Sequence, residues 1–147
     1  MTVLPPDYHP SEDEEFMNPL QKEYFRQKLL RWKAELLEEA GHVITNLSHN
    51  NTPESDIADQ ASLETNLAFE LRTHDRAQKL ISKIDRALQR IDNGTYGYCE
   101  ITGEPISLKR LEARPIATLS IEAQEQHERM ERVLQNNSFR TMRDLIN

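Results

Sequence analysis

Apolar residues recur every three or four positions along two long stretches of the chain. The first stripe lies within residues 25–47 and the second within residues 63–91. This period is that of an α-helix with one apolar face, and each pattern spans roughly thirty residues, or about 45 Å of helix. The first stripe consists of Phe25, Leu29, Trp32, Leu36, Ala40, Val43 and Leu47. The second consists of Leu63, Leu67, Leu71, His74, Ala77, Ile81, Ile84, Leu88 and Ile91.

A polar segment, residues 46–61, separates the two patterns. Its sequence is NLSHNNTPESDIADQA, in which Pro53 ends the first helix and Ser55 or Asp56 can cap the second. So short a connection allows only antiparallel neighbours. The pattern therefore predicts a coiled-coil hairpin over residues 18–93, with its tip at residues 50–61.

Capping signals mark the other ends of the two helices. Asn18 precedes Pro19, so Asn18 can cap the first helix, Pro19 suits its first position, and Gln21 can return the capping bond. Gly94 follows the second helix and is placed to act as a left-handed C-cap. We expect the first helix to run to about His49.

The remaining residues predict smaller elements. Short apolar pieces within residues 95–118 alternate with glycines and prolines, which favours turns and two small strands. Ser120 can cap a final helix that runs to about Leu134. Residues 136–147 form a weakly patterned tail, in which Phe139, Met142 and Leu145 could form one more short helix. Residues 1–17 hold three prolines and an acidic cluster, and we expect them to be mobile. The predicted fold is mainly α: a long antiparallel coiled-coil hairpin, then a small globular domain with the C-terminal helix at residues 94–135.

Composition narrows the classes of function. The chain has 147 residues, a net charge of -7 and a pI near 5.3. The phosphates of a nucleic acid would repel the molecule as a whole, so direct duplex binding is not expected. The sequence has neither a long apolar run nor a basic start followed by an apolar core, which predicts a cytoplasmic protein without a membrane segment. The single cysteine, Cys99, excludes an internal disulfide and agrees with a reducing compartment.

Cations recur along one face of the second predicted helix. This basic strip consists of Arg72, Arg76, Lys79, Lys83, Arg86 and Arg90. Asp75 and Asp85 lie beside it, and a helix favours cations towards its C-terminus, so a solvated face is a sufficient explanation. The alternative is an anion site or a docking surface for an acidic partner. Lys109, Arg110 and Arg114 in the small domain support that alternative.

The tip carries two carboxylates, Asp56 and Asp59. Both would fall in the first turn of the second helix, where the helix dipole favours a negative charge by about 0.3 to 1 kcal/mol. The functional alternative is that a carboxylate at the end of a rigid rod reaches into a narrow channel of a partner. Composition does not choose between the two.

Three motifs together resemble the DksA/TraR family of transcription factors. The string GYCEITGEPISLKRLEARPIATLSIEA is similar to the small domain of that family, where GYC-x-x-C-G, R-L-x-A-x-P and C-x-x-C build a zinc site. The tip DIADQA matches the D-x-x-D-x-A motif, and E-L-R-x-x-D-R is present at residues 70–76. The resemblance covers residues 18–130 and implies the hairpin fold with a zinc-ribbon-like domain.

One departure from the family pattern concerns the metal. The cysteine positions of the zinc-bearing members correspond here to Cys99, Thr102, Ser120 and Ala123. One thiolate cannot close a tetrahedral structural site, so the domain resembles the cysteine-poor branch of the family and zinc is not expected. Apolar packing would then hold the domain, with Cys99 as a small core residue. The expected core consists of Tyr96, Tyr98, Ile101, Ile106, Leu108, Leu111, Ile116 and Leu119.

The resemblance also implies a function. Family members bind RNA polymerase at its secondary channel and present the coiled-coil tip near the catalytic centre without catalysing a reaction themselves. By that likeness, Asp59 alters the stability of promoter complexes, and Asp56 and Ala61 support it. A monomer without cofactor and without sequence-specific DNA binding is implied.

The family likeness further implies an effector site for ppGpp at the interface with polymerase. The matching positions here are Leu80, Lys83 and Arg114, and Arg76 and Arg110 belong to the same cationic surface. Lys and Arg suit phosphates because each offers several donors and a full charge. A further basic position of the family site is Gln124 in this chain, so this chain departs from the family pattern there.

Two other functions fit the same residues. Asp56 and Asp59 could hold Mg²⁺ in a secondary-channel factor for transcript cleavage or against backtracking, although two exposed acids alone make a weak metal site. A plain coiled-coil adaptor would need no special tip. Transcript shortening in a backtracked complex distinguishes the first, and competition for the polymerase channel distinguishes the second.

Overall fold

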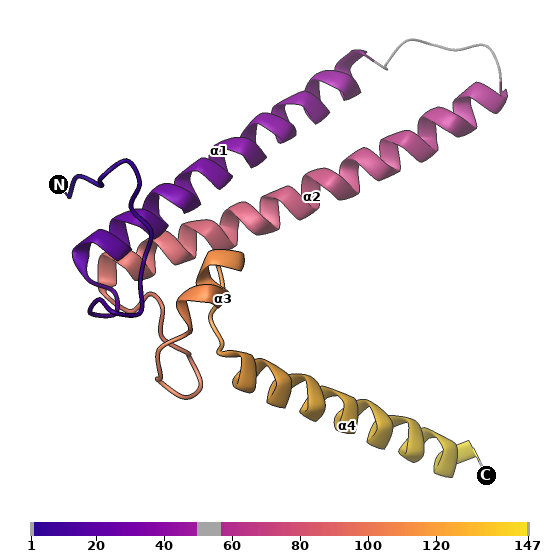
Figure 1. The fold of residues 1–147 in the computed structure, drawn as a ribbon. Helices are drawn as coiled ribbons and strands as arrows, with labels where there is room; N and C mark the ends of the chain where they lie inside the picture. The colour runs from indigo at the N-terminus through magenta and orange to yellow at the C-terminus, as the bar shows by residue number, and fades with distance from the viewer. Residues whose placement is uncertain (1, 50–56, 147) are drawn as a thin grey trace.

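Four helices make up most of the described chain: α1 (Pro19–His49), α2 (Ile57–Asn93), α3 (Leu108–Ala113) and α4 (Ile121–Ile146). The computed structural model describes the backbone of residues 2–49 and 57–146 and the side chains of residues 2–42 and 60–146. Figure 1 shows α1 and α2 as an antiparallel hairpin, α3 beside the base of α2, and α4 extending away from both. The predicted mainly α fold with a long hairpin is confirmed. Among the described helices, none is long and apolar enough to cross a membrane.

The caps predicted at the base of the hairpin form, with one shifted bond, whereas the cap predicted at Ser55 or Asp56 lies outside the described residues. Asn18 Oδ1 accepts a hydrogen bond from the Gln21 amide at 2.9 Å. The Gln21 side chain is fully buried and its Oε1 accepts from the Met17 amide at 2.8 Å, one residue before the expected donor. The Asn18 amide is already bonded to the carbonyl of Glu15 at 3.3 Å, which explains the shift. At the end of α2, Gly94 has the left-handed φ of 78° expected of a C-cap.

Two interhelical ion pairs record the register of the hairpin. Arg26 on α1 pairs with Asp92 on α2, and Lys33 Nζ lies 2.7 Å from Asp85 Oδ1. The pairs are seven positions later on α1 and seven earlier on α2, as antiparallel helices require. Exposed pairs of this kind contribute about 1 kcal/mol or less, so apolar packing supplies most of the stability.

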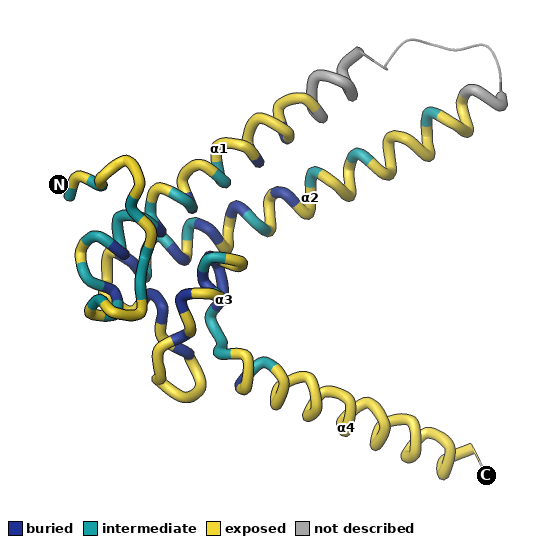
Figure 2. The backbone as a smooth tube through the Cα atoms, viewed as in Figure 1, coloured by how far each residue is buried: buried dark blue, intermediate teal, exposed yellow. Residues whose placement is uncertain are grey.

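The apolar seam is buried at the base of the hairpin and exposed further out. Phe25, Leu29 and Ile84 have no exposed surface, and Figure 2 shows the buried residues gathered near the small domain. Leu67 and Leu71 on the outer part of α2 are 43% and 48% exposed, so the predicted stripe is only partly covered there. Two helices alone cover only one side of each seam residue. At the base, other parts of the chain cover the remaining side.

One core joins the hairpin to the small domain. The same apolar cluster contains Phe25 and Leu29 of α1, Ile84 of α2, and Tyr96 and Leu111 of the small domain. The rings of Phe25 and Tyr96 lie 5.7 Å apart between centroids. The Tyr96 hydroxyl donates to the carbonyl of Pro115 at 2.7 Å, and burial raises the pKa of Tyr96 above its usual range. The hairpin and the small domain are therefore packed as one unit.

The N-terminal segment contributes to this core. Its composition had suggested a mobile segment that does not pack on the rest of the fold. Met17 is 6% exposed and belongs to the core cluster, with Phe16 packed beside it. Both side chains approach Gly97, where an added Cβ would lie 3.1 Å from Met17 Cε and 3.2 Å from Phe16 Cζ. Gly97 also has a φ of 89°, so close packing and backbone conformation both require glycine there. Further out, the Tyr8 hydroxyl donates to Glu14 at 2.9 Å.

The small domain contains turns and a short helix where two strands were predicted. No β-strand occurs among the residues that the structure describes, and the sheet-like element is a single antiparallel bridge between Tyr98 and Pro105. Pro105 has no amide hydrogen, which prevents a longer ladder. The Ser107 hydroxyl then accepts from the Arg110 amide at 3.2 Å and caps α3. The prediction of two strands was wrong because one of the bridge residues is a proline and a helix cap follows two residues later.

Six of the eight predicted core residues of the small domain lie inside it. Tyr96, Ile106, Leu108, Leu111 and Ile116 are buried, and Leu119 is packed against the core. The prediction was wrong for Ile101, which is 61% exposed, and for Tyr98, which is 38% exposed. Ile101 lies in the turn at residues 100–102, and Tyr98 is the bridge residue, whose ring meets that of Phe16 edge-on with centroids 5.4 Å apart.

The last helix is longer than predicted. α4 continues to Ile146 instead of ending near Leu134, so the residues expected to form a separate tail are part of it. Asn136 and Asn137 have low helix propensity but do not break a helix, and no glycine or proline follows Ser120. The predicted cap is confirmed, since Ser120 Oγ accepts from the Ala123 amide at 3.2 Å.

Candidate functional site

The tip residues lie at the limit of the described chain. Asp56 is outside the described residues, and Asp59 is the third residue of α2 with its side chain outside them. Ala61 is exposed on α2, and its carbonyl accepts from the Thr65 hydroxyl at 2.9 Å. The role of the tip therefore stays a prediction.

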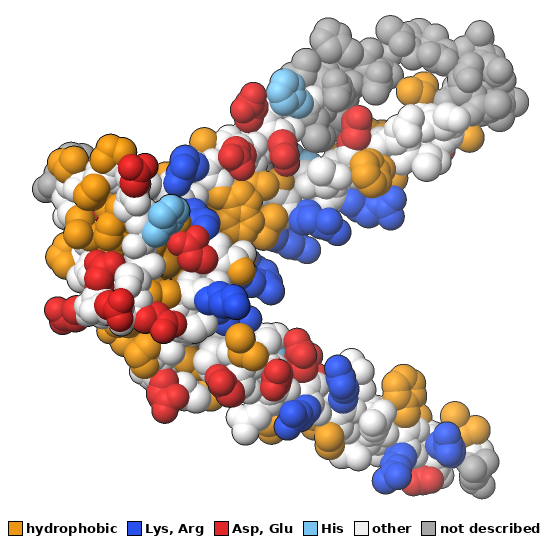
Figure 3. Space-filling view, in the orientation of Figure 1, with side chains coloured by type: hydrophobic (Ala, Val, Ile, Leu, Met, Phe, Trp, Pro, Cys, Tyr) orange, Lys and Arg blue, Asp and Glu red, His pale blue; other side chains and the backbone are white. Residues whose placement is uncertain are grey.

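The basic strip follows α2 towards the small domain. Five of its six members are exposed and Arg90 is partly buried. Figure 3 shows blue side chains along the edge of the hairpin that faces α4, while red side chains are common on the opposite edge of α1. The strip is thus a local positive surface on an acidic molecule.

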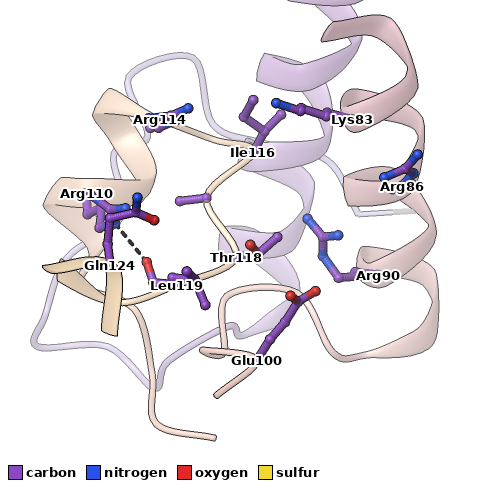
Figure 4. A pocket seen from close by; sticks show the side chains of 11 residues that line it. Lys83, Arg86, Arg90, Glu100, Arg110, Arg114, Ile116, Thr118, Leu119 and Gln124 are labelled. Carbon is purple, nitrogen blue, oxygen red and sulfur yellow. Dashed lines mark hydrogen bonds between the residues drawn. The ribbon is translucent and has the colours of Figure 1, made fainter. Parts of the chain in front are cut away.

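The strip ends in a cavity between α2, α3 and α4. The cavity has a volume of about 290 Å³. Its cations are Lys83, Arg86, Arg90, Arg110 and Arg114, and Glu100, Ile116, Ala117, Thr118, Leu119 and Gln124 complete the lining. Figure 4 shows the α2 cations on one wall, those of α3 and Gln124 on the other, and the chain through Thr118 between them. We call this cavity the cationic pocket.

Local hydrogen bonds fix the α3 side of the cationic pocket. The Arg110 Nε donates to the carbonyl of Leu119 at 2.9 Å, drawn as a dashed line in Figure 4. The Arg114 amide donates to the carbonyl of Arg110 at 2.7 Å, and the Arg114 carbonyl accepts from Ala117 at 3.0 Å. The Arg110 side chain is therefore oriented, and the backbone that carries Arg114 is held in place. Several guanidinium groups around one cavity favour a compact anion that accepts from several donors at once.

The structure brings together only part of the predicted effector site. Lys83, Arg110 and Arg114 line the cationic pocket. Leu80 and Arg76 instead line a neighbouring hollow of about 370 Å³ on α2, which shares Lys83 with the pocket. The Gln124 amide donates to Glu128 at 3.1 Å, and it carries no charge.

Three charged residues of this pocket were not assigned to the effector site from the sequence. Arg86 and Arg90 belong to the basic strip, whose spacing of three and four residues was the available signal. Glu100 follows Cys99 in a turn, and no pattern in the sequence links it to α2. Only the packing of the small domain on the hairpin places its side chain beside those arginines.

The four positions that correspond to zinc ligands do not form a metal site. Ser120 Oγ caps α4, Ala123 has no ligand atom, and Cys99 is a buried free thiol. No group of three possible ligands of the His, Cys, Asp or Glu type occurs in the described part of the chain. A zinc ion needs four ligands in a structural site, so these residues do not fit the metal.

Hydrogen bonds surround the Cys99 sulfur in place of a metal. Burial raises the pKa of the Cys99 thiol, but donors from the Thr102 side chain and from the backbone of Ser120, Thr102 and Ile101 lower it, to about 6 overall. A further hydrogen bond holds the backbone at this residue, since the Gly103 amide donates to the Cys99 carbonyl at 2.9 Å. The sulfur of Cys99 is thus hydrogen-bonded to two other positions that correspond to zinc ligands, Thr102 and Ser120.

Chelation is therefore expected to leave the protein's stability unchanged. A large excess of EDTA should shift the thermal melting temperature by less than the error of the measurement, because hydrogen bonds and apolar packing hold the small domain. EDTA saturated with zinc beforehand serves as the control for non-specific effects of the chelator. A lower melting temperature with free EDTA alone, or one equivalent of zinc in the purified protein, would contradict the assignment.

Family models match both parts of the chain. The model described as the N-terminal domain of DnaK suppressor protein DksA matches residues 21–91. The model described as the prokaryotic dksA/traR C4-type zinc finger matches residues 94–129, the segment in which three of the four cysteines are replaced. The boundary between the two models falls at the Gly94 cap.

Curated relatives and a solved structure agree with this assignment. The chain is 62% identical over 127 residues to the RNA polymerase-binding transcription factor DksA of Caulobacter vibrioides, covering 86% of this chain and 89% of the relative. It is 37% identical over 115 residues to the protein of the same name from Escherichia coli K12, covering 78% and 76%. The structure of transcription factor DksA2 from Pseudomonas aeruginosa superimposes with a TM-score of 0.76 at 43% identity, covering 82% of this chain and 94% of that one. Shared helices, shared motifs and this level of identity together show that the chain belongs to the DksA/TraR family of transcription factors.

Proposed function

We propose that this protein binds RNA polymerase, inserts the tip of the α1–α2 hairpin into the secondary channel, and modulates transcription initiation together with ppGpp. The observation that carries the proposal is the 62% identity to a relative named for RNA polymerase binding. The protein acts as a monomer and has no catalytic residues of its own.

The shape of the molecule supports insertion. α2 is 37 residues long, which corresponds to about 55 Å. Its outer end carries Asp59, and its inner end is held in the core that the hairpin shares with the small domain. A rod anchored at one end can place a carboxylate deep in a narrow channel while the bulk of the protein remains outside.

The cationic pocket supports a role for a polyphosphate effector. Five cations line a cavity of about 290 Å³, a volume at the lower limit of ligand pockets. It suits a diphosphate group more closely than a whole nucleotide. The nucleoside would lie outside the pocket, where Leu80 and polymerase can contact it. An interface site of this kind makes the effector response depend on the complex.

Purified components test the proposal. Binding to RNA polymerase should be saturable, should compete with another secondary-channel protein, and should change transcript yield from a ppGpp-sensitive promoter. Binding without competition would contradict channel insertion and favour a plain adaptor. Shortening of the transcript in a backtracked complex would contradict a non-catalytic tip and favour the cleavage factor. If the protein competes for the channel but changes neither transcript yield nor transcript length, the regulatory role is contradicted.

Removing a pocket cation is expected to weaken the ppGpp response. Lys83→Ala or Arg114→Ala should raise the half-maximal ppGpp concentration about tenfold or more, because a hydrogen bond to a charged group contributes about 1.5 to 3 kcal/mol. The change in transcription without ppGpp should be smaller. Titration of ppGpp in the purified transcription reaction measures both quantities.

An exposed arginine outside the pocket provides the control. Arg31→Ala removes the same charge from the protein. Arg31 lies on α1 and does not line the cationic pocket. Its half-maximal ppGpp concentration should match wild type. If the Lys83 and Arg114 variants also match wild type, the pocket is not the effector site.

A further inference from the structure

The cationic pocket contains a carboxylate that opposes its apparent ligand preference. Within the described lining, Glu100 is the one acidic residue beside five cations. Figure 4 shows Glu100 at the edge of the pocket, which Arg90 also lines. An anion that enters the pocket would approach Arg86 and Arg90 and meet this negative charge as well.

The backbone holds Glu100 in this place. Its amide donates to the carbonyl of Thr118, another lining residue, at 2.9 Å. The preceding residue, Cys99, is buried, and its amide donates to the carbonyl of Glu104 at 2.8 Å. These bonds hold the backbone on the N-terminal side of the Glu100 Cα next to the lining residue Thr118.

The Glu100 carboxylate is not neutralised by a contact ion pair. The ion pairs among the described residues join other groups, including Lys28 with Glu112 and Lys33 with Asp85. A charge without a contact partner acts on its neighbours through the intervening solvent, over a distance of about 8 to 10 Å at physiological salt. Glu100 lines the cationic pocket, so its charge acts on an anion bound there.

We propose that Glu100 sets the effector threshold of the cationic pocket. It lowers the affinity for polyphosphate anions, so the pocket fills only at a raised effector concentration. Arg86 and Arg90 supply the attraction that Glu100 offsets, and they act as phosphate ligands in addition to Lys83 and Arg114. This inference rests on the proposed function of the pocket as the ppGpp site.

The sign of the effect follows from electrostatics. Removing a negative charge beside a bound polyanion removes a repulsion, and the effect grows with the charge of the ligand. Because Glu100 is exposed, solvent and salt reduce the effect. We expect a change of about three- to tenfold in the effector concentration at physiological salt, and a larger change at lower salt.

Glu100→Gln in the complex with RNA polymerase tests the inference. The amide keeps the shape of the side chain and removes its charge. The half-maximal ppGpp concentration should fall about three- to tenfold, and this change should shrink as the salt concentration rises. Arg90→Ala should shift the half-maximal concentration in the opposite direction. An unchanged or raised value for Glu100→Gln would overturn the inference.

Glu104→Gln is the matched control. Glu104 is exposed in the same turn but does not line the cationic pocket, and its variant should respond to ppGpp as wild type does. A fall of equal size in this control would show a non-specific effect of net charge and would overturn the inference. Thermal melts without ppGpp should be equal for both variants; a lower melting temperature for Glu100→Gln alone would assign Glu100 to folding instead.

The Lys83 and Arg114 variants separate this inference from the proposed function. If they lose the ppGpp response while Glu100→Gln behaves as wild type, the threshold role fails and the effector site stands. If none of these variants changes the response, the effector site fails together with the inference.

Discussion

Asp59→Asn is expected to abolish most of the effect on transcription initiation while binding to RNA polymerase stays near wild type. The substitution keeps the size of the side chain and removes its charge. Asp59 is the third residue of α2, far from the shared core and from the cationic pocket. Polymerase contacts made by the base of the hairpin would therefore remain. Transcript yield from a responsive promoter and the equilibrium binding constant for polymerase are the two measurements.

Two results would contradict a functional tip. Equal loss of binding and of regulation would indicate a docking role for Asp59. A lower melting temperature with full regulation would favour the alternative in which Asp59 only stabilises the helix N-terminus, a contribution of about 0.3 to 1 kcal/mol. Glu64→Gln provides the control, because Glu64 is an exposed acid five residues further along α2. It should match wild type in both assays.

Phe25→Ala is expected to lower the free energy of unfolding by about 3 to 5 kcal/mol. Phe25 has no exposed surface, and its ring packs against those of Tyr24 and Tyr96 with centroids 5.3 and 5.7 Å away. The loss is large beside a total stability of about 5 to 15 kcal/mol. Urea unfolding followed by circular dichroism measures it.

The location of the loss tests whether the two parts share a core. Hydrogen exchange at the Ile106 amide, bonded to the Gly97 carbonyl at 2.7 Å, should accelerate in Phe25→Ala although Ile106 lies in the small domain. Unchanged exchange there would contradict a shared core. Phe69→Ala is the control, because Phe69 is 65% exposed and its truncation should change stability by about 0.5 kcal/mol or less.

The capped helix ends were predictable because capping is local, whereas the end of α4, which has no capping signal, was not. The bonds at Asn18 and Ser120 join residues only three positions apart, so the necessary residue types are adjacent in the sequence. Gly94 ends α2 for the same reason, since its left-handed φ needs no distant partner. The antiparallel pairing followed from the short connection between two long apolar stripes.

The small domain was harder to predict because its residues depend on distant ones. Ile101 and Ile106 have the same apolar character, yet one is 61% exposed and the other fully buried. Gly97 is required by Phe16 and Met17, which are about eighty positions earlier in the chain. Residue type alone does not distinguish an apolar side chain in a turn from one in the core.

The candidate site also has one part that the sequence predicts and one part that only the tertiary structure shows. The basic strip on α2 could be read from the sequence because a helical period places its cations on one face. The cationic pocket could not, since Glu100, Arg110 and Arg114 reach the strip only after the small domain packs on the hairpin. Local bonding and periodicity therefore specified the helices and their charges. Long-range apolar packing decided which charges became neighbours, because burial depends on the whole fold while capping depends on a few adjacent residues.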